Sequence, residues 1–176
     1  MTSSLPLAAI FFARGETVDD VLAAAAETLA AEGLVVAGTV QAVGAAEEGC
    51  CGPMLVRDLS DGTVTVISQD LGKLATGCRL DGGALAEVAV RLDAALDRGA
   101  DVLVVNRFGK AEGEGGGLRS VIERAVADGL PVVLAVRADH AAVWDAFHAG
   151  TATTLPADAA AVVRWCREAM AAPRAA

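Results

Sequence analysis

The sequence predicts an α/β fold built on a doubly wound, mostly parallel sheet, and three observations predict it. Short runs are apolar throughout, as in strands covered on both faces, at 7–12, 34–40, 102–105 and 131–136. Between the first two runs, apolar residues recur at helical spacing, which makes a β-α-β unit. No internal repeat or linker interrupts the pattern, so residues 1–176 are expected to form a single α/β domain.

Capping and stop signals set the expected helix limits. Thr17, followed three residues later by Asp20, forms a capping-box pattern, and Gly33 supplies a stop, so the first helix is expected over about 18–32. Asp81 is placed to cap a helix over about 83–97. Further expected elements are a helix with Leu118, Val121, Ile122 and Val126 inward, helices over 141–148 and 159–170, and an edge strand over 151–155.

The segment 50–77 differs from the rest of the chain in its pattern of apolar and polar residues. Apolar and polar residues alternate over 54–57 and 63–67, on either side of an Asp61-Gly62 turn. This pattern predicts a small β-hairpin inserted after the second strand.

Composition excludes several classes of protein. The 176 residues carry 14 Lys and Arg against 23 Asp and Glu, and this net charge of −9 argues against a nucleic-acid binder. No apolar run reaches the roughly 18 residues of a spanning helix, and residues 1–6 have no basic n-region, so no membrane insertion and a cytoplasmic location are expected. The four cysteines are then expected to be reduced thiols.

Ligands of an open parallel sheet collect beyond the carboxyl ends of its strands. That rule selects residues 13–17, Gln41, residues 106–117 and residues 137–140. In the first loop, where a phosphate-binding loop would lie, one glycine remains, the lysine is absent, and Glu16 would repel a phosphate. Arg14 and the Thr17 hydroxyl still offer anion contacts, but the loop argues against high-turnover ATP hydrolysis.

The segment 106–117 is rich in glycine and precedes a helix, which suits an anion. Arg107 and Lys110 add positive charge, while Glu112 and Glu114 subtract it. A surface loop with self-paired charges is an equal alternative.

The cysteines divide into two groups. Cys78 and Arg79 precede the helix that Asp81 caps, where a thiol pKa falls and an arginine can hold an oxyanion. Cys50 or Cys51 can join Cys78 as a metal ligand across the inserted segment, although the spacing matches no zinc motif. Cys166 lies at helical spacing with apolar residues and is expected in the core. Packing is also the better interpretation of His140 and His148.

Residues 34–41 and 54–59, the motif Cys78-Arg79-Leu80-Asp81 and the motif Asn106-Arg107-Phe108-Gly109-Lys110-Ala111-Glu112 together resemble an uncharacterised bacterial family. This domain of unknown function is associated with molybdate transport, and the likeness runs from about 7 to 147. The layout is similar, more distantly, to small P-loop nucleoside triphosphatases with the motif D-E-x-G-x-x-E, and Asn106, Gly109 and Glu112 stand in the corresponding places. The resemblance implies a P-loop-like fold with a degenerate Walker A loop.

The departures from that motif argue for binding without hydrolysis. Asn106 cannot supply the carboxylate that helps to hold Mg²⁺, and the first loop has no lysine. The leading hypothesis is a small protein that binds molybdate, tungstate or a phosphorylated small molecule and serves molybdenum uptake or metalloenzyme metabolism. The predicted ligand-binding residues are Arg14, Gln41, Arg79, Asn106, Lys110, Gly113, Gly115, Gly116 and Gly117. The glycines near 115 and the Arg79 corner are expected to face one shared hollow.

Two alternatives stay open. One is a nucleotide hydrolase or transferase with an atypical P-loop that uses Glu112 and Lys110. The other is a regulator of a transporter or metalloenzyme that docks through the inserted hairpin. A homodimer is also compatible with an exposed strand edge.

Overall fold

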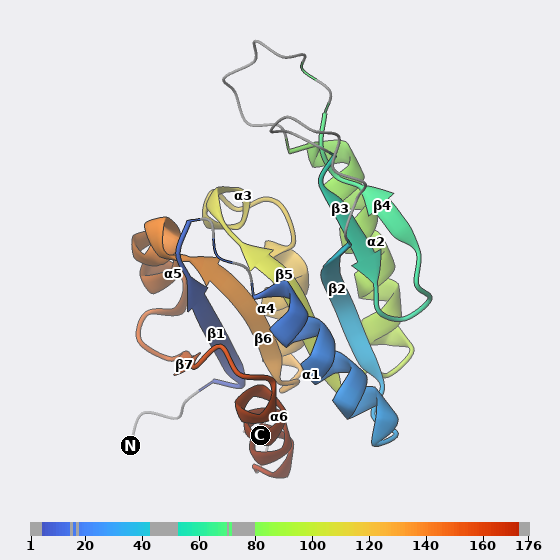
Figure 1. Cartoon of the computed structure of the whole chain (residues 1–176), viewed down its shortest axis with the longest axis vertical. Coiled ribbons are helices and arrows are strands. Elements are labelled where there is room, and N and C mark those ends of the chain that lie inside the picture. The colour runs from blue at the N-terminus through green and yellow to red at the C-terminus, as the bar shows by residue number, and fades with distance from the viewer. Residues whose placement is uncertain are drawn as a thin grey trace.

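The computed structural model describes residues 5–14, 16, 18–42, 53–69, 71 and 80–172. In these ranges a seven-stranded sheet runs in the order β4-β3-β2-β5-β6-β1-β7 (Figure 1). Parallel pairing joins β2 (Val36–Ala42), β5 (Val102–Phe108), β6 (Val132–Arg137), β1 (Leu7–Phe12) and β7 (Thr153–Leu155). The α/β, mostly parallel fold that the sequence predicts is therefore confirmed.

The hairpin lies within the predicted segment and extends the sheet. Its strands β3 (Leu55–Asp58) and β4 (Val64–Val66) pair antiparallel, and β3 pairs antiparallel with β2. Asp58 and Gly62 form the turn, where the Gly62 nitrogen donates to the Asp58 carbonyl and Gly62 adopts a φ of 75°. Residues 50–52, 70 and 72–77 of the predicted segment lie outside the described ranges.

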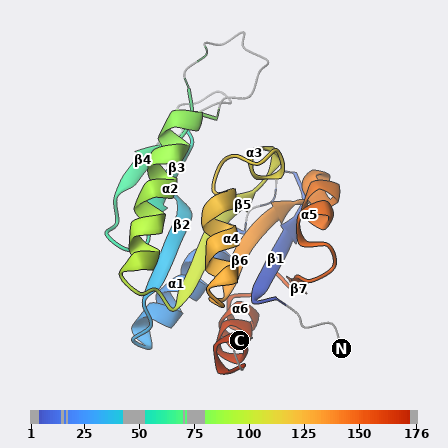
Figure 2. The same cartoon turned by 180° about the vertical axis from the view of Figure 1, so that it is seen from behind.

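Helices cover both faces of the sheet. On one face lie α1 (Asp19–Ala31) and α6 (Ala159–Ala171), whose apolar residues pack with Ile10, Val40 and Val104. On the other face lie α2 (Gly82–Asp97) and α4 (Arg119–Ala127), as Figure 2 shows from behind. The short helix α3 (Lys110–Gly113) and α5 (Ala141–His148) stand beyond the carboxyl ends of β5 and β6, where Trp144 and Phe108 stack edge to face with ring centres 5.0 Å apart.

The expected helix limits agree with the structure to within about one residue. Asp81 caps α2, because its carboxylate accepts from the nitrogens of Gly83 and Ala84. Thr17 lies outside the described residues, and Val18, at the N-cap of α1, makes no side-chain capping bond. Cys166 is fully buried, as expected. Within the described residues, no helix is long and apolar enough to cross a membrane.

The central strand departs from its expected limits. It runs to Phe108, past the expected end at residue 105, with a bulge between Val105 and Phe108. The region after it, expected as an open loop over 109–117, contains the helical turn α3. A β-bulge lets a strand pass polar residues without ending, and it re-aims their side chains.

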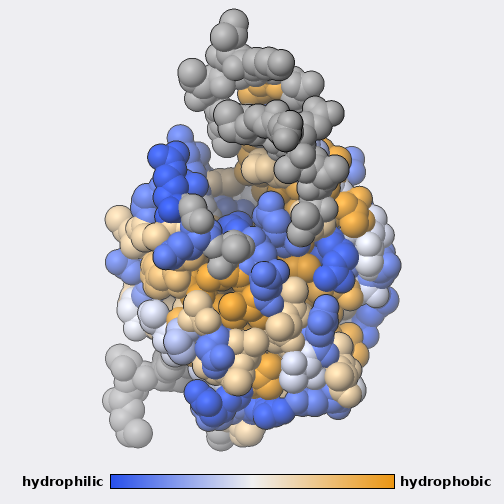
Figure 3. Space-filling model, viewed as in Figure 1, coloured by the Kyte–Doolittle hydropathy of each residue, from blue (hydrophilic) through white to orange (hydrophobic). Residues whose placement is uncertain are grey.

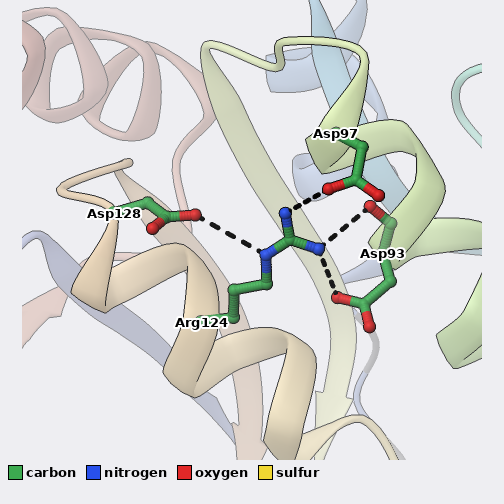
Figure 4. A network of polar contacts seen from close by, with 4 residues as sticks. All are labelled: Asp93, Asp97, Arg124 and Asp128. Carbon is green, nitrogen blue, oxygen red and sulfur yellow. Dashed lines mark hydrogen bonds and ion pairs between the residues drawn. The ribbon is translucent and has the colours of Figure 1, made fainter.

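An ionic clamp ties α2 to α4 on the face away from α1. Arg124 of α4 donates to Asp93 at 3.0 Å and to Asp97, and its Nε lies 3.6 Å from Asp128 (Figure 4). The hydrogen bonds from Asp97 and then Asp93 raise the pKa of Arg124 above its usual value. This contact joins two neighbouring helices on one face of the sheet.

Candidate functional site

Asn106 occupies the carboxyl end of the central strand, where it is buried with 6% of its surface exposed. Its Oδ1 accepts a hydrogen bond of 3.0 Å from the Thr39 hydroxyl of β2, which fixes the amide. No described residue accepts from its Nδ2. Among the described residues, one side-chain polar atom is both inaccessible to solvent and without a hydrogen-bond partner, and it is Nε of Arg91. Since the Asn106 Nδ2 has no partner and is not that atom, it remains accessible to solvent. The site therefore holds a fixed amide NH₂ whose two N–H groups make no hydrogen bond to a described residue.

Arg107, the next residue, is fully engaged. Its guanidinium donates to both carboxylate oxygens of Asp19, at 2.8 and 2.9 Å, and to the Asn106 carbonyl at 2.6 Å. It also lies 4.5 Å from the centre of the Phe12 ring. Arg107 thus links the ends of β5 and β1 to the first turn of α1, and its charge is neutralised there.

The loop after β1 closes on itself through Glu16. The Glu16 carboxylate accepts from the Ala13 nitrogen at 2.8 Å, and the Glu16 nitrogen donates to the Ala13 carbonyl at 3.1 Å. Arg14 is exposed beside this turn. Gly15 and Thr17 lie outside the described residues. A carboxylate therefore occupies one backbone donor that an anion would use.

Glu112 is buried and acts as an internal staple of the segment after β5. Its carboxylate accepts from the Gly109 nitrogen at 2.9 Å and from the Leu118 nitrogen at 3.1 Å. Gly117 is required beside it, since a Cβ there would lie 2.2 Å from Oε1 of Glu112, and φ is +58°. Both carboxylate oxygens are used to hold the loop.

Most of the glycine backbone N–H groups already donate hydrogen bonds within the same segment. The nitrogens of Gly113, Gly115 and Gly116 donate to the carbonyls of Gly109, Glu112 and Ala111 respectively. Gly113 also lets α3 approach α5, because a Cβ there would lie 2.0 Å from Cγ1 of Val143. An anion held by these three amides would have to replace existing hydrogen bonds, so the segment is not a preformed backbone cradle.

Three of the predicted polar residues are exposed and can reach a ligand: Arg14, Gln41 and Lys110. The Lys110 side chain is 76% exposed and lies 3.7 Å from Glu114, a surface pair of little energy. Gln41 is exposed at the end of β2.

Arg79 and the predicted metal ligands Cys50, Cys51 and Cys78 lie outside the described residues. In the described ranges, no group of three or more His, Cys, Asp or Glu residues is arranged to hold a metal ion. The shared hollow and the cysteine site stay predictions.

Arg137, which the strand-end rule selects but the list of predicted ligand-binding residues leaves out, also stands at this edge. It pairs in register with Phe12 of β1, and its Nε donates to Asp139 at 2.6 Å. Hydrogen bonding to Asp139 raises the pKa of Arg137, and the same bond lowers the pKa of Asp139. The His140 Nε2 lies 3.3 Å from Arg137. Its position at the end of β6 is the signal that selects Arg137 from the sequence, whereas its contacts with Asp139 and His140 follow only from the structure.

Comparison with known proteins finds a family, a relative and a solved structure that resemble this chain. The chain is 34% identical over 162 residues to the molybdenum import ATP-binding protein ModC 2 of Bradyrhizobium diazoefficiens. The match covers 92% of the chain but only 18% of ModC 2, so the chain spans less than a fifth of that relative's length. The chain is also similar in structure to THEP1 from the hyperthermophile Aquifex aeolicus, known from a crystal structure, with a TM-score of 0.59 and 15% sequence identity. The superposed region covers 86% of this chain and 89% of the THEP1 chain.

At this identity the likeness to THEP1 is a likeness of fold, which extends over most of both chains. Residues 7–165 match a family described as a protein of unknown function, DUF2478. That range contains the described strands and the edge residues Arg14, Asn106 and Lys110. The chain therefore belongs to the DUF2478 family, as its sequence motifs indicate.

Proposed function

We propose that this chain binds an oxyanion or a phosphorylated small molecule at the carboxyl edge of its sheet. The observation that carries the proposal is the Asn106 Nδ2, a donor fixed by Thr39 on a buried residue and without a partner among the described residues. Because this donor is held in place and still reaches solvent, an anion can accept from it without breaking a hydrogen bond within the protein.

Cationic side chains at the same edge supply the charge. Arg14 and Lys110 are exposed there, and Arg137 needs only to exchange its contact with Asp139 for a ligand. Because side chains rather than backbone amides would then hold the anion, a compact tetrahedral ion fits better than a triphosphate chain. Molybdate and tungstate are the first candidates, since the relative ModC 2 is named for molybdenum import. A role in molybdenum uptake or metalloenzyme metabolism in the cytoplasm follows as part of the proposal.

Two features argue against hydrolysis at this edge. Asn106 offers no negative charge for Mg²⁺, and both oxygens of Glu112 already accept from backbone nitrogens. A general base must be free to take a proton from water, and Glu112 would have to release the loop to do so.

Isothermal titration of the purified chain with molybdate, tungstate, sulfate and phosphate tests the proposal. We expect saturable binding of at least one of these ions and a loss of about tenfold or more in Asn106→Asp, which replaces a donor with a negative charge. Lys110→Ala should weaken binding, whereas Arg164→Ala, which removes an exposed charge on α6, should not. Equal heats for the parent and Asn106→Asp would sink the proposal.

A nucleotide-binding enzyme is the second candidate, favoured by the identity to a protein named as ATP-binding and by the P-loop type of fold. Its signature is Mg²⁺-dependent phosphate release that collapses in Glu112→Gln but survives in Glu114→Gln. If no nucleoside triphosphate gives release above buffer, this candidate fails while oxyanion binding stands.

A further inference from the structure

A pocket lies at the end of the sheet opposite to the carboxyl edge, where β2 begins. It has a volume of about 430 Å³ and lies between α1, the turn after β3 and the end of α2. Because β3 runs antiparallel to β2, with Asp58 beside Thr39, the β3 turn lies beside the start of β2. The pocket is therefore separate from the carboxyl edge that holds Asn106. A volume of this size is typical of sites for small molecules.

The wall of this pocket is aliphatic. The apolar side chains that line it are Ala26, Ala30, Leu34, Val35, Val36, Ala37, Leu59 and Ala95. No aromatic ring lies among the described lining residues. Figure 3 shows the face that carries α1, with hydrophobic surface over the neighbouring hairpin, where Val64 and Val66 are half exposed. A flexible aliphatic chain suits such a wall better than a flat aromatic ring does.

The charges of the pocket leave one cation unused. Asp61 accepts from the Thr63 nitrogen, and this bond, followed by more distant attraction from Arg91 and Arg98, lowers the pKa of its carboxyl. Arg98 lines the same pocket, and its charge offsets that of Asp61. Arg57 of β3 is half-buried, and its guanidinium makes no hydrogen bond or ion pair with any described residue. A half-buried guanidinium with no carboxylate partner among the described residues is suited to pair with the carboxylate of a ligand.

The remaining acids limit the charge of the ligand. Glu27 on the α1 wall and Asp61 on the turn would repel a second negative group. From these contacts we propose that the pocket binds a small aliphatic monocarboxylate, with its carboxylate on Arg57 and its chain against Leu34, Val36 and Leu59. This inference does not rest on the function proposed for the carboxyl edge.

Titration calorimetry on the whole chain tests the proposal with butanoate, hexanoate and octanoate as probes. The affinity should increase with chain length, because each added methylene buries apolar surface. Octanol should bind at least about tenfold more weakly than octanoate, because it cannot form the charged pair with arginine. Octanedioate should also bind more weakly than octanoate. Saturating molybdate should leave octanoate binding unchanged, which separates this pocket from the carboxyl edge.

Arg57→Gln should weaken octanoate binding by about tenfold or more, and Arg57→Lys should give an intermediate affinity. Arg164→Gln removes the same charge from the exposed face of α6 and should have no effect. Circular dichroism confirms that each variant is folded. The proposal is overturned if octanol matches octanoate, if Arg57→Gln matches Arg164→Gln, or if no probe binds. The proposal is also overturned if sedimentation shows that the parent is a dimer and that Arg57→Gln is a monomer, because the pocket would then be a contact between two copies of the chain.

Discussion

Arg107 and Asp19 join the end of the central strand to the start of α1 through two parallel hydrogen bonds of 2.8 and 2.9 Å. The pair is partly buried, with 32% and 19% of the two side chains exposed. The two residues are 88 positions apart in the sequence, and their contact joins β5 to the helix that follows the loop after β1. The pair therefore fixes the direction of α1 relative to the sheet.

Replacing Arg107 with lysine should destabilise the fold even though the charge is kept. Lysine cannot form two parallel bonds to a carboxylate while stacking on Phe12, so the free energy of unfolding should fall by about 1 kcal/mol. Urea unfolding followed by circular dichroism measures this change. Arg164→Lys, on the exposed surface of α6, is the matched control and should be neutral. Equal losses in the two variants would contradict a specific role for the pair.

The staple formed by Glu112 predicts a difference between two glycines. Both Gly115 and Gly117 have positive φ, at +94° and +58°, so alanine is strained at each by about 1 kcal/mol. A Cβ on Gly115 meets nothing within 4 Å, whereas one on Gly117 meets the Glu112 carboxylate. Gly117→Ala should therefore lower the free energy of unfolding by about 2–3 kcal/mol, more than Gly115→Ala does. Thermal unfolding of the two variants checks this, and an equal loss would show that the staple yields easily.

Cys166 should resist alkylation in the folded chain. Burial raises the pKa of its thiol to about 12, so at pH 8 only about one molecule in ten thousand carries the reactive thiolate. Iodoacetamide followed by peptide mapping should modify Cys166 only in denaturant. Rapid native labelling at this residue would show that α6 opens readily.

The same shift predicts how stability varies in alkaline solution. The folded thiol keeps its proton up to a pH near 12, while an unfolded thiol loses it above about 8.5, so the unfolded state gains ionisation between those values. Stability should fall as pH rises through that window, by at most about 1.4 kcal/mol per pH unit. Cys166→Ala should remove this part of the slope when unfolding is measured at a series of pH values.

The layers and the helix limits could be predicted because they depend on apolar periodicity and capping. The run 7–12 coincides with β1, and Asp81 caps α2 as its position indicates. The end of β5 could not be predicted in this way. Asn106 and Arg107 are polar, which breaks the apolar pattern, yet the backbone continues through a bulge to Phe108. Burial of polar side chains at a strand end is decided by partners that lie elsewhere in the sequence.

The site illustrates the same limit. Strand-end positions in the sequence identify which segments meet at the carboxyl edge, and Asn106, Lys110 and Arg14 lie there. Strand-end positions do not show which of these polar groups already form hydrogen bonds within the protein. That Arg107 is held by Asp19, and Glu112 by two backbone nitrogens, follows only from tertiary contacts. Free donors can therefore be separated from occupied ones only when the partners are known.

Arg124 provides a test of how far a surface cluster stabilises two packed helices. It alone neutralises Asp93, Asp97 and Asp128 in the cluster of Figure 4, so Arg124→Gln leaves three carboxylates facing one another between α2 and α4. The variant should unfold at a lower urea concentration than the parent, because repulsion replaces attraction. Since these groups are partly exposed, salt screens the repulsion, and the loss should be greater in dilute buffer than in molar salt. Arg164→Gln, the matched control, should show no salt-dependent loss of stability. If Arg124→Gln loses the same stability at both salt levels, the contribution of Arg124 comes from packing rather than from its charge.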